Sequence, residues 1–246
     1  MTDRRQRTAN PGEVRAALRA AASLGMFFRL ADPGLDEAGW QPAGLLYASG
    51  SGALDAMLDD AAARLGGCER RVAASLLFQG YAARLLSPQV GCLVTSGCVP
   101  AVPAASLRWR RPDAEVVELG LEAGTGWLGP ADVLTEVMLT QSFHSHLRPL
   151  ADAVRARVRI PATVLRDNAA SALVGALRLA DDKIGRAWRP GWRLLAEMAL
   201  AHPRLRGSGT IGLGEPAFVR RSCCLYYRVD NGGLCGDCPL AGGAVG

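Results

Sequence analysis

The sequence of 246 residues is poor in lysine, histidine and aromatic side chains. Of its 28 basic residues only Lys183 is a lysine, and it contains three histidines and 6% aromatic residues. The net charge of +5 is spread along the chain, and no run of basic residues is longer than two. Proteins that bind nucleic acid usually concentrate Lys and Arg on one face, so we expect no nucleic-acid partner.

No segment has the composition of a membrane span or an export signal. Residues 10–15, which follow a basic start, are polar and charged where a secretory signal needs an apolar core. The longest uncharged stretch, residues 85–107, contains three prolines and several polar side chains, so we expect buried loop and strand there. We therefore expect a cytoplasmic protein without a membrane span, and peripheral membrane association stays open.

Several common catalytic motifs are also missing. The sequence has no Walker loop, no G-x-S-x-G, and no G-x-G-x-x-G that follows a predicted strand. Nothing therefore supports a bound flavin or nicotinamide domain, a nucleotidase or a serine hydrolase. A redox reaction in this protein would need an external electron donor.

The apolar pattern predicts an α+β fold with a mainly helical body and a small antiparallel sheet. Helical spacing predicts helices over about residues 10–24, 52–65, 69–86, 130–140, 161–180 and 187–201. Patterns typical of antiparallel strands occupy residues 89–99, 107–110 and 114–119, and residues 154–160 fit either a strand or a helix end.

The composition changes at residue 207. Five of the ten residues 207–216 are glycine or proline and none is arginine, which is typical of a linker or a turn-rich segment. We predict a body over residues 1–206 and a C-terminal module over 207–246. This module is too short to fold on an apolar core of its own, so a metal, the body, or both must hold it.

The cysteines fall into two groups. Four are crowded into the last 24 residues, namely Cys223, Cys224, Cys235 and Cys238. The other three are scattered, namely Cys68, Cys92 and Cys98. In a reducing compartment a cysteine cluster indicates metal or redox chemistry, whereas isolated cysteines are better explained as small buried hydrophobic residues.

Four thiolates suit either a tetrahedral zinc ion or the terminal positions of an iron–sulfur cluster. The adjacent pair Cys223–Cys224 differs from the separated C-x-x-C knuckles of zinc ribbons. Cys238 precedes a proline, as in ferredoxin-type loops, and Gly232 and Gly233 allow backbone amides to turn toward sulfur. No histidine lies in the module, which excludes a Rieske-type centre built from local ligands. The pattern favours iron–sulfur and leaves structural zinc as the alternative.

The spacing C-C-x10-C-x2-C near the C-terminus resembles the FhuF-like ferric siderophore reductases, which carry a [2Fe-2S] cluster on this motif. The resemblance implies that the cluster ligands are Cys223, Cys224, Cys235 and Cys238. It also implies an oxidoreductase that reduces the Fe(III) of a siderophore, with the hydroxamate type favoured, and takes its electron from a ferredoxin or a flavoprotein reductase. It names no catalytic side chain beyond the cluster.

Two other functions stay open for the same cysteines. They could form a structural zinc module beside a non-redox binding body, or a [2Fe-2S] electron-transfer subunit of another oxidoreductase. We expect Arg220, Arg221 and Arg228 either to tune a cluster or meet an anionic partner, or to be solvated. Tyr226 and Tyr227 either shield a cluster from water or belong to the core.

Two further patterns carry less weight. His144 and His146 would share a face on a strand, but the chain has few other donors nearby, so we expect no second metal site. Trp188 and Trp192 are four residues apart on a predicted helix, a spacing that suits the core better than a docking face.

Overall fold

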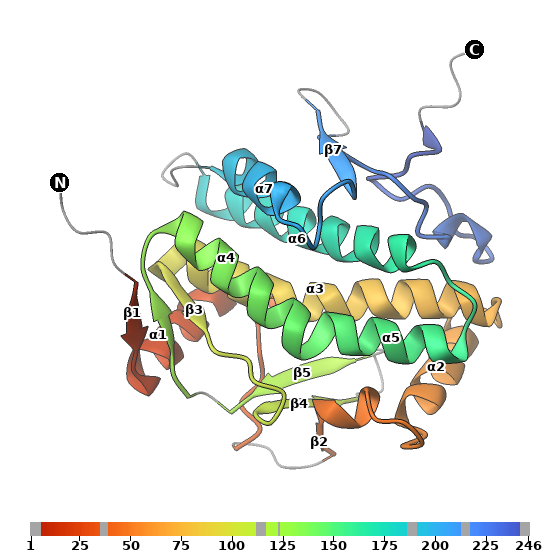
Figure 1. Cartoon of the computed structure of the whole chain (residues 1–246), viewed down its shortest axis with the longest axis horizontal. Helices are drawn as coiled ribbons and strands as arrows, with labels where there is room; N and C mark the ends of the chain where they lie inside the picture. Colours follow the sequence, from red (N-terminus) through yellow and green to blue (C-terminus); the bar gives the residue numbers. More distant parts are fainter. Residues whose placement is uncertain are drawn as a thin grey trace.

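The computed structural model describes residues 6–34, 39–111, 117–122, 124–185, 191–212 and 217–241. Two long helices, α3 (Arg70–Ser96) and α6 (Ala162–Ile184), pack along each other at the centre. Figure 1 shows the other helices around this pair, short strands to one side of it and the C-terminal segment to the other. The predicted α+β class with a mainly helical body is confirmed.

The remaining elements are short. The other helices are α1 (Pro11–Ala22), α2 (Ala53–Arg64), α4 (Ala131–Ser142), α5 (Arg148–Arg157) and α7 (Trp192–Ala201). A π-helical turn, Phe143–Leu147, joins α4 to α5, and 3-10 turns cover Met26–Phe28, Ala43–Leu46 and Tyr226–Arg228.

The described strands pair antiparallel in three small sheets. The first has the order β1 (Arg7–Ala9), β6 (Gly126–Leu128), β3 (Cys98–Pro100), and the second β2 (Gln41–Pro42), β4 (Leu107–Arg110), β5 (Glu118–Leu121). The third is the hairpin of β7 (Gly209–Ile211) and β8 (Phe218–Arg220).

The start of α1 forms where the sequence predicts it. The side chain of Asn10 accepts from the backbone N of Glu13 at 3.0 Å, and the Glu13 carboxylate accepts from Asn10 N at 2.9 Å. This reciprocal pair satisfies two amides that have no partner inside the helix, and Pro11 suits the first turn. The predicted apolar face of α6 is also confirmed, since Leu165 and Leu173 are buried on it.

The strand predicted over residues 89–99 is wrong. Helix α3 continues through this region to Ser96, and only Cys98–Pro100 is a strand. Val90 and Cys92 lie among residues buried on every side of the helix, so no amphipathic period marks it as helical. The helix continues past Pro88, and the side-chain amide of Gln89 donates to the Leu85 carbonyl at 2.9 Å.

Two other predicted boundaries change or fall outside the described residues. Residues 154–160 contain the end of α5 at Arg157, so of the two alternatives the helix end is the one observed. Helix α7 begins at Trp192, while residues 186–190, including Trp188, lie outside the described residues.

Within the part that is described, no helix is both long enough and apolar enough to cross a membrane.

Candidate functional site

The C-terminal segment packs against α3 and α6 (Figure 1). Its β7–β8 hairpin leads directly into the cysteines. Cys224 and Cys238 are buried, whereas Cys223 and Cys235 are half-buried, and all four are free thiols. The fold therefore brings the four predicted site residues into one module with two sulfurs toward the interior and two nearer the surface.

The sulfur atoms of Cys224 and Cys235 lie 3.6 Å apart. Metal–sulfur bonds of about 2.3 Å in tetrahedral geometry place two sulfurs about 3.8 Å apart, so this pair has the separation that one metal ion requires. Cys223 Sγ accepts from the backbone N of Leu225 at 3.3 Å. Burial raises the pKa of Cys223, and the nearby sulfurs of Cys238 and Cys235 raise it further.

The hydrogen bond between Cys224 and Cys235 makes one thiol more acidic than the other. It is the main cause that lowers the pKa of Cys224 to about 7 and raises the pKa of Cys235. The positive charge of Arg220 acts on both thiols in the lowering direction. Because thiolates rather than thiols bind metal, a cation beside these sulfurs favours ligation.

The turn between the two cysteine pairs needs its glycine. Asn231 adopts a left-handed backbone with φ +58°, and Gly232 N donates to the Val229 carbonyl at 2.7 Å. A Cβ at Gly232 would overlap the carbonyl of Tyr226 and lie 2.7 Å from the oxygen of Val229. Only glycine fits this close backbone approach, which brings Cys235 back toward Cys224.

Arg220 is a buried cation at the base of the module, only 1% exposed. Its guanidinium donates to the Ser222 carbonyl at 2.7 Å, to Gln79 Oε1 at 3.1 Å and to Asn168 Oδ1. Among the described residues, no carboxylate forms an ion pair with it. A buried guanidinium held by neutral acceptors leaves its positive charge available to the neighbouring sulfurs.

A polar network anchors this module to the two central helices. Ser75 of α3 donates to the Cys224 carbonyl at 2.8 Å, and Asn168 of α6 donates to the Ser75 carbonyl at 2.7 Å. Ser171 of α6 donates to Asp237 Oδ2 at 2.5 Å, next to Cys238. Each cysteine pair is thus tied to the body by a neighbouring hydrogen bond.

The sequence did not identify these helix residues as part of the site. The sequence does contain a signal for them, namely polar residues on an otherwise apolar helix face. On α6 these are Asp167, Asn168 and Ser171, and on α3 they are Ser75 and Gln79. Polar side chains on a buried helix face need partners, which here come from the C-terminal segment.

The other predicted residues are placed as follows. Cys92 and Cys98 are buried, as predicted, and Cys68 is half-buried against the core. The half-buried ring of Trp192 lies under the guanidinium of Arg193, 4.7 Å from the ring centroid. His146 lies in the π-helical turn and not on a strand.

The residues that flank the cysteines differ in exposure. Arg221 and Arg228 are exposed, and Arg228 pairs with Glu69 at 2.8 Å, whereas Arg220 is not solvated. Tyr226 and Tyr227 are 39% and 47% exposed, so they do not belong to the core.

One known family matches the module. Residues 220–240 match the FhuF 2Fe-2S C-terminal domain. The predicted resemblance to the FhuF-like family is confirmed by this match, which covers the four cysteines, and the matched domain indicates a [2Fe-2S] cofactor. No curated protein matches the chain.

The residues present fit the FhuF-type cofactor. In the described residues, which include the four cysteines, no three His, Cys, Asp or Glu side chains are arranged around one metal ion. A [2Fe-2S] cluster needs only two protein sulfurs at each iron, and the pair Cys224 and Cys235 has the required separation. A negatively charged cluster also suits the buried Arg220.

Proposed function

We propose that this protein is a ferric siderophore reductase in which Cys223, Cys224, Cys235 and Cys238 hold a [2Fe-2S] cluster. The supporting observation is the FhuF-type match at residues 220–240, together with the sulfurs of Cys224 and Cys235 at 3.6 Å. When bound, such a cluster supplies one electron at a time. Residues 1–206 would serve as the docking scaffold and residues 207–246 as the redox module.

Reduction releases iron because of the ligands that siderophores use. Hard oxygen donors hold Fe(III) tightly, and one added electron gives Fe(II), a softer and less charged ion that the same oxygens hold weakly. The step breaks no covalent bond in the siderophore. An external donor, a ferredoxin or flavoprotein reductase, returns one electron to the protein for each Fe(III) reduced.

The residues of the chain have definite tasks in this scheme. The hydrogen bonds of Ser75 to the Cys224 carbonyl and of Ser171 to Asp237 fix the module on rigid helices. The charge of Arg220 offsets part of the negative charge that the sulfurs bring together. All seven cysteines are free, which suits the reducing cytosol that we propose as its location.

The direct test begins with protein purified without oxygen. We expect a red-brown protein whose visible absorbance is bleached by dithionite, with two iron and two sulfide per chain. The reduced protein is then mixed with ferric hydroxamates and catecholates, and Fe(II) is trapped by a coloured chelator. A colourless protein with one zinc would favour the structural module, and a coloured protein that reduces no chelate would favour an electron-transfer subunit.

A further inference from the structure

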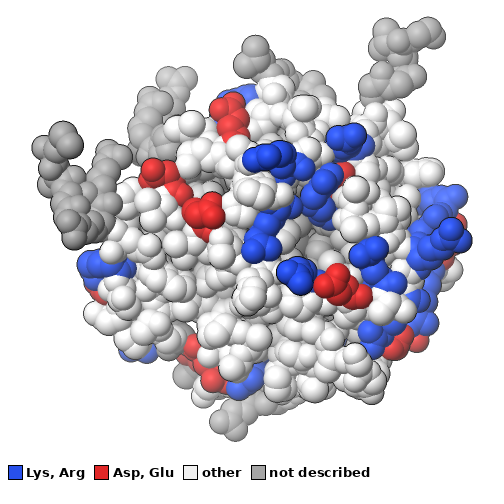
Figure 2. All heavy atoms as spheres, in the orientation of Figure 1, with Lys and Arg blue, Asp and Glu red and all other residues white. Residues whose placement is uncertain are grey.

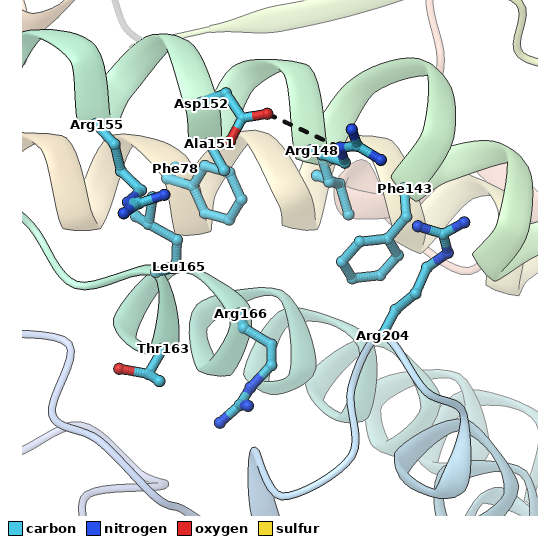
Figure 3. A pocket seen from close by; sticks show the side chains of 12 residues that line it. Phe78, Phe143, Arg148, Ala151, Asp152, Arg155, Thr163, Leu165, Arg166 and Arg204 are labelled. Atoms are coloured by element: carbon cyan, nitrogen blue, oxygen red, sulfur yellow. Dashed lines mark ion pairs between the residues drawn. The ribbon is translucent and has the colours of Figure 1, made fainter.

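A pocket of about 310 Å³ lies between α5 and α6, close to the C-terminal module. Its floor is apolar and comes from Phe78, Phe143, Leu147, Ala151 and Leu165. Figure 3 shows the rings of Phe78 and Phe143 between the two helices. Phe143 and Leu147 belong to the π-helical turn, a deviation from regular helix that recurs at functional sites.

The rim of the pocket is positively charged. Four arginines line it, Arg148, Arg155, Arg166 and Arg204, against one acidic residue, Asp152. We call this site, with its rim and its apolar floor, the arginine pocket. Figure 2 shows Lys and Arg side chains gathered around a hollow on this face, where they outnumber Asp and Glu.

Two of these arginines have no side-chain partner among the residues that the structure describes. Arg148 pairs with Asp152 at 3.9 Å, and Arg166 pairs with the buried Asp167 at 2.9 Å. Within the described part of the chain, the side chains of Arg155 and Arg204 form neither an ion pair nor a hydrogen bond. In Figure 3, Arg155 extends from α5 toward Leu165, and Arg204 lies beside Phe143. Both charges are therefore available to a ligand.

A short chain of hydrogen bonds connects the pocket to the cysteine module. Arg166 donates to Asp167 Oδ1 at 2.9 Å and to the Gly207 carbonyl at 3.1 Å. Asp167 Oδ2 accepts from the backbone N of Ser222 at 3.0 Å. Ser222 directly precedes Cys223, so a ligand in the arginine pocket would sit close to the first predicted cluster ligand.

We propose that the arginine pocket binds an anionic, aromatic ferric chelate of the catecholate class, in place of the hydroxamate type that the family resemblance favours; this inference rests on the proposed reductase function. Three hydroxamates carry one negative charge each and neutralise Fe(III), whereas three catecholates carry two each and leave the complex negative. The charge of Arg155 and Arg204 favours the second class. Its rings can also pack on Phe143 and under a guanidinium, contacts that an aliphatic hydroxamate lacks.

The size of the pocket sets how such a chelate binds. A volume of about 310 Å³ is at the lower end for drug-sized ligands, so one arm of the chelate enters and the rest stays outside. Partial entry leaves the iron near the rim. Binding and electron transfer then depend on different residues, which allows the two to be tested separately.

The test measures binding without electron transfer. Ga(III) has the charge of Fe(III) but is not reduced, so Ga(III) complexes of a tricatecholate, a trihydroxamate and citrate are titrated by calorimetry into the cluster-loaded protein. We expect the tricatecholate complex to bind at least about tenfold more tightly than the other two complexes. We also expect its binding to weaken with added salt. Citrate is anionic but has no ring, so it separates the contribution of charge from that of the aromatic floor.

Charge reversal at the rim locates the site. We expect Arg155→Glu and Arg204→Glu each to weaken tricatecholate binding about tenfold. The matched control is Arg15→Glu on the exposed face of α1, which does not line the pocket and should leave binding unchanged. Arg204 is half-buried, so Arg204→Gln provides a second variant with less risk to folding, and circular dichroism with the cluster spectrum checks that each variant is intact.

The possible outcomes distinguish a failure of the arginine pocket from a failure of the reductase function. Equal binding of the three complexes, no binding, or binding unaffected by Arg155→Glu and Arg204→Glu overturns the arginine pocket, even if the protein reduces ferric chelates. Selective binding that the two variants weaken supports the pocket. If that binding occurs but Fe(III) tricatecholate is not reduced, the pocket stands and the reductase function fails.

Discussion

Asp167 of α6 accepts two hydrogen bonds from Ser222, the residue that directly precedes Cys223. Its Oδ2 atom receives the backbone N at 3.0 Å and the hydroxyl at 2.6 Å, while Oδ1 receives the guanidinium of Arg166 at 2.9 Å. Asp167 is completely buried, so its carboxylate depends on these protein partners instead of water. The start of the cysteine module is therefore positioned by a charged group inside the helical body.

Replacing Asp167 should loosen the module. Asp167→Asn keeps the size of the side chain but removes the charge that Arg166 and Ser222 share. We expect the free energy of unfolding to fall by about 2–3 kcal/mol, with a lower iron content after reconstitution. Urea unfolding and an iron assay measure both.

The control for this variant is Asp152→Asn. Asp152 and Arg148 form an exposed pair at 3.9 Å, whose loss should change stability by less than about 1 kcal/mol. If Asp167→Asn and Asp152→Asn unfold alike and hold the same amount of iron, the position of Cys223 does not depend on Asp167.

The buried charge of Arg220 should raise the reduction potential of the cluster. It is 1% exposed, and no carboxylate among the described residues pairs with it. Reduction adds negative charge near this cation, so Arg220→Met should lower the midpoint potential by tens of millivolts, on the order expected for one charge near a cluster. Arg220→Lys, which keeps the charge, should recover part of the shift.

Arg221, the residue that follows Arg220, provides the matched control for the effect of a buried charge. Its side chain is exposed, so solvent and salt screen its charge, and Arg221→Met should change the potential far less than Arg220→Met. Spectroelectrochemical titration of the three variants compares them directly. Equal shifts at both positions would mean that net charge, and not the buried position of Arg220, controls the potential.

Each of the four clustered cysteines should be needed for the cofactor. Single Ser replacements at Cys223, Cys224, Cys235 and Cys238 should each remove most of the visible absorbance and the bound iron, since thiolate ligands are lost. The control is Cys68→Ser, a half-buried cysteine outside the module, which should keep full absorbance. Iron and sulfide assays accompany the spectra, and full iron content in Cys224→Ser would contradict the ligand assignment.

The sequence predicted the helices with one apolar face but not those buried all around. Helix α6 was predicted because Leu165 and Leu173 repeat at helical spacing on its buried face. The pattern at the end of α3 predicts a strand instead of a helix, because Val90, Cys92 and their neighbours are buried whichever way they point. Burial on every side removes the periodic signal that distinguishes helix from strand.

In the site too, the sequence predicts residues that are close along the chain but not contacts between distant segments. All four clustered cysteines lie within sixteen residues, so the sequence alone predicts the module. Asn168 meets Arg220 across 52 positions of the chain, and Ser75 meets Cys224 across 149. Such pairings depend on how α3 and α6 pack, and no local pattern specifies them.

A buried histidine outside the cysteine module should make stability depend on pH. His146 Nε2 donates to the Val102 carbonyl at 2.6 Å, and its Nδ1 accepts from the hydroxyl of Tyr47 at 2.8 Å. The Tyr47 hydroxyl is also hydrogen-bonded to the hydroxyl of Tyr81. Because a carbonyl oxygen can only accept, the neutral ring carries its proton on Nε2. Burial penalises the charged ring and lowers the pKa of His146 from 6.5 to about 4.

The folded state binds the proton of His146 less readily than the unfolded state does. Stability from this residue is therefore complete above pH 6.5 and is lost as the pH falls toward 4, by up to about 3 kcal/mol. His146→Gln can keep hydrogen bonds to Val102 and Tyr47 but does not titrate, so its stability should fall less over this range. The control His144→Gln changes an exposed neighbour and should follow the wild type in urea unfolding at each pH. The same pH slope in His146→Gln and wild type would show that other groups cause the acid sensitivity.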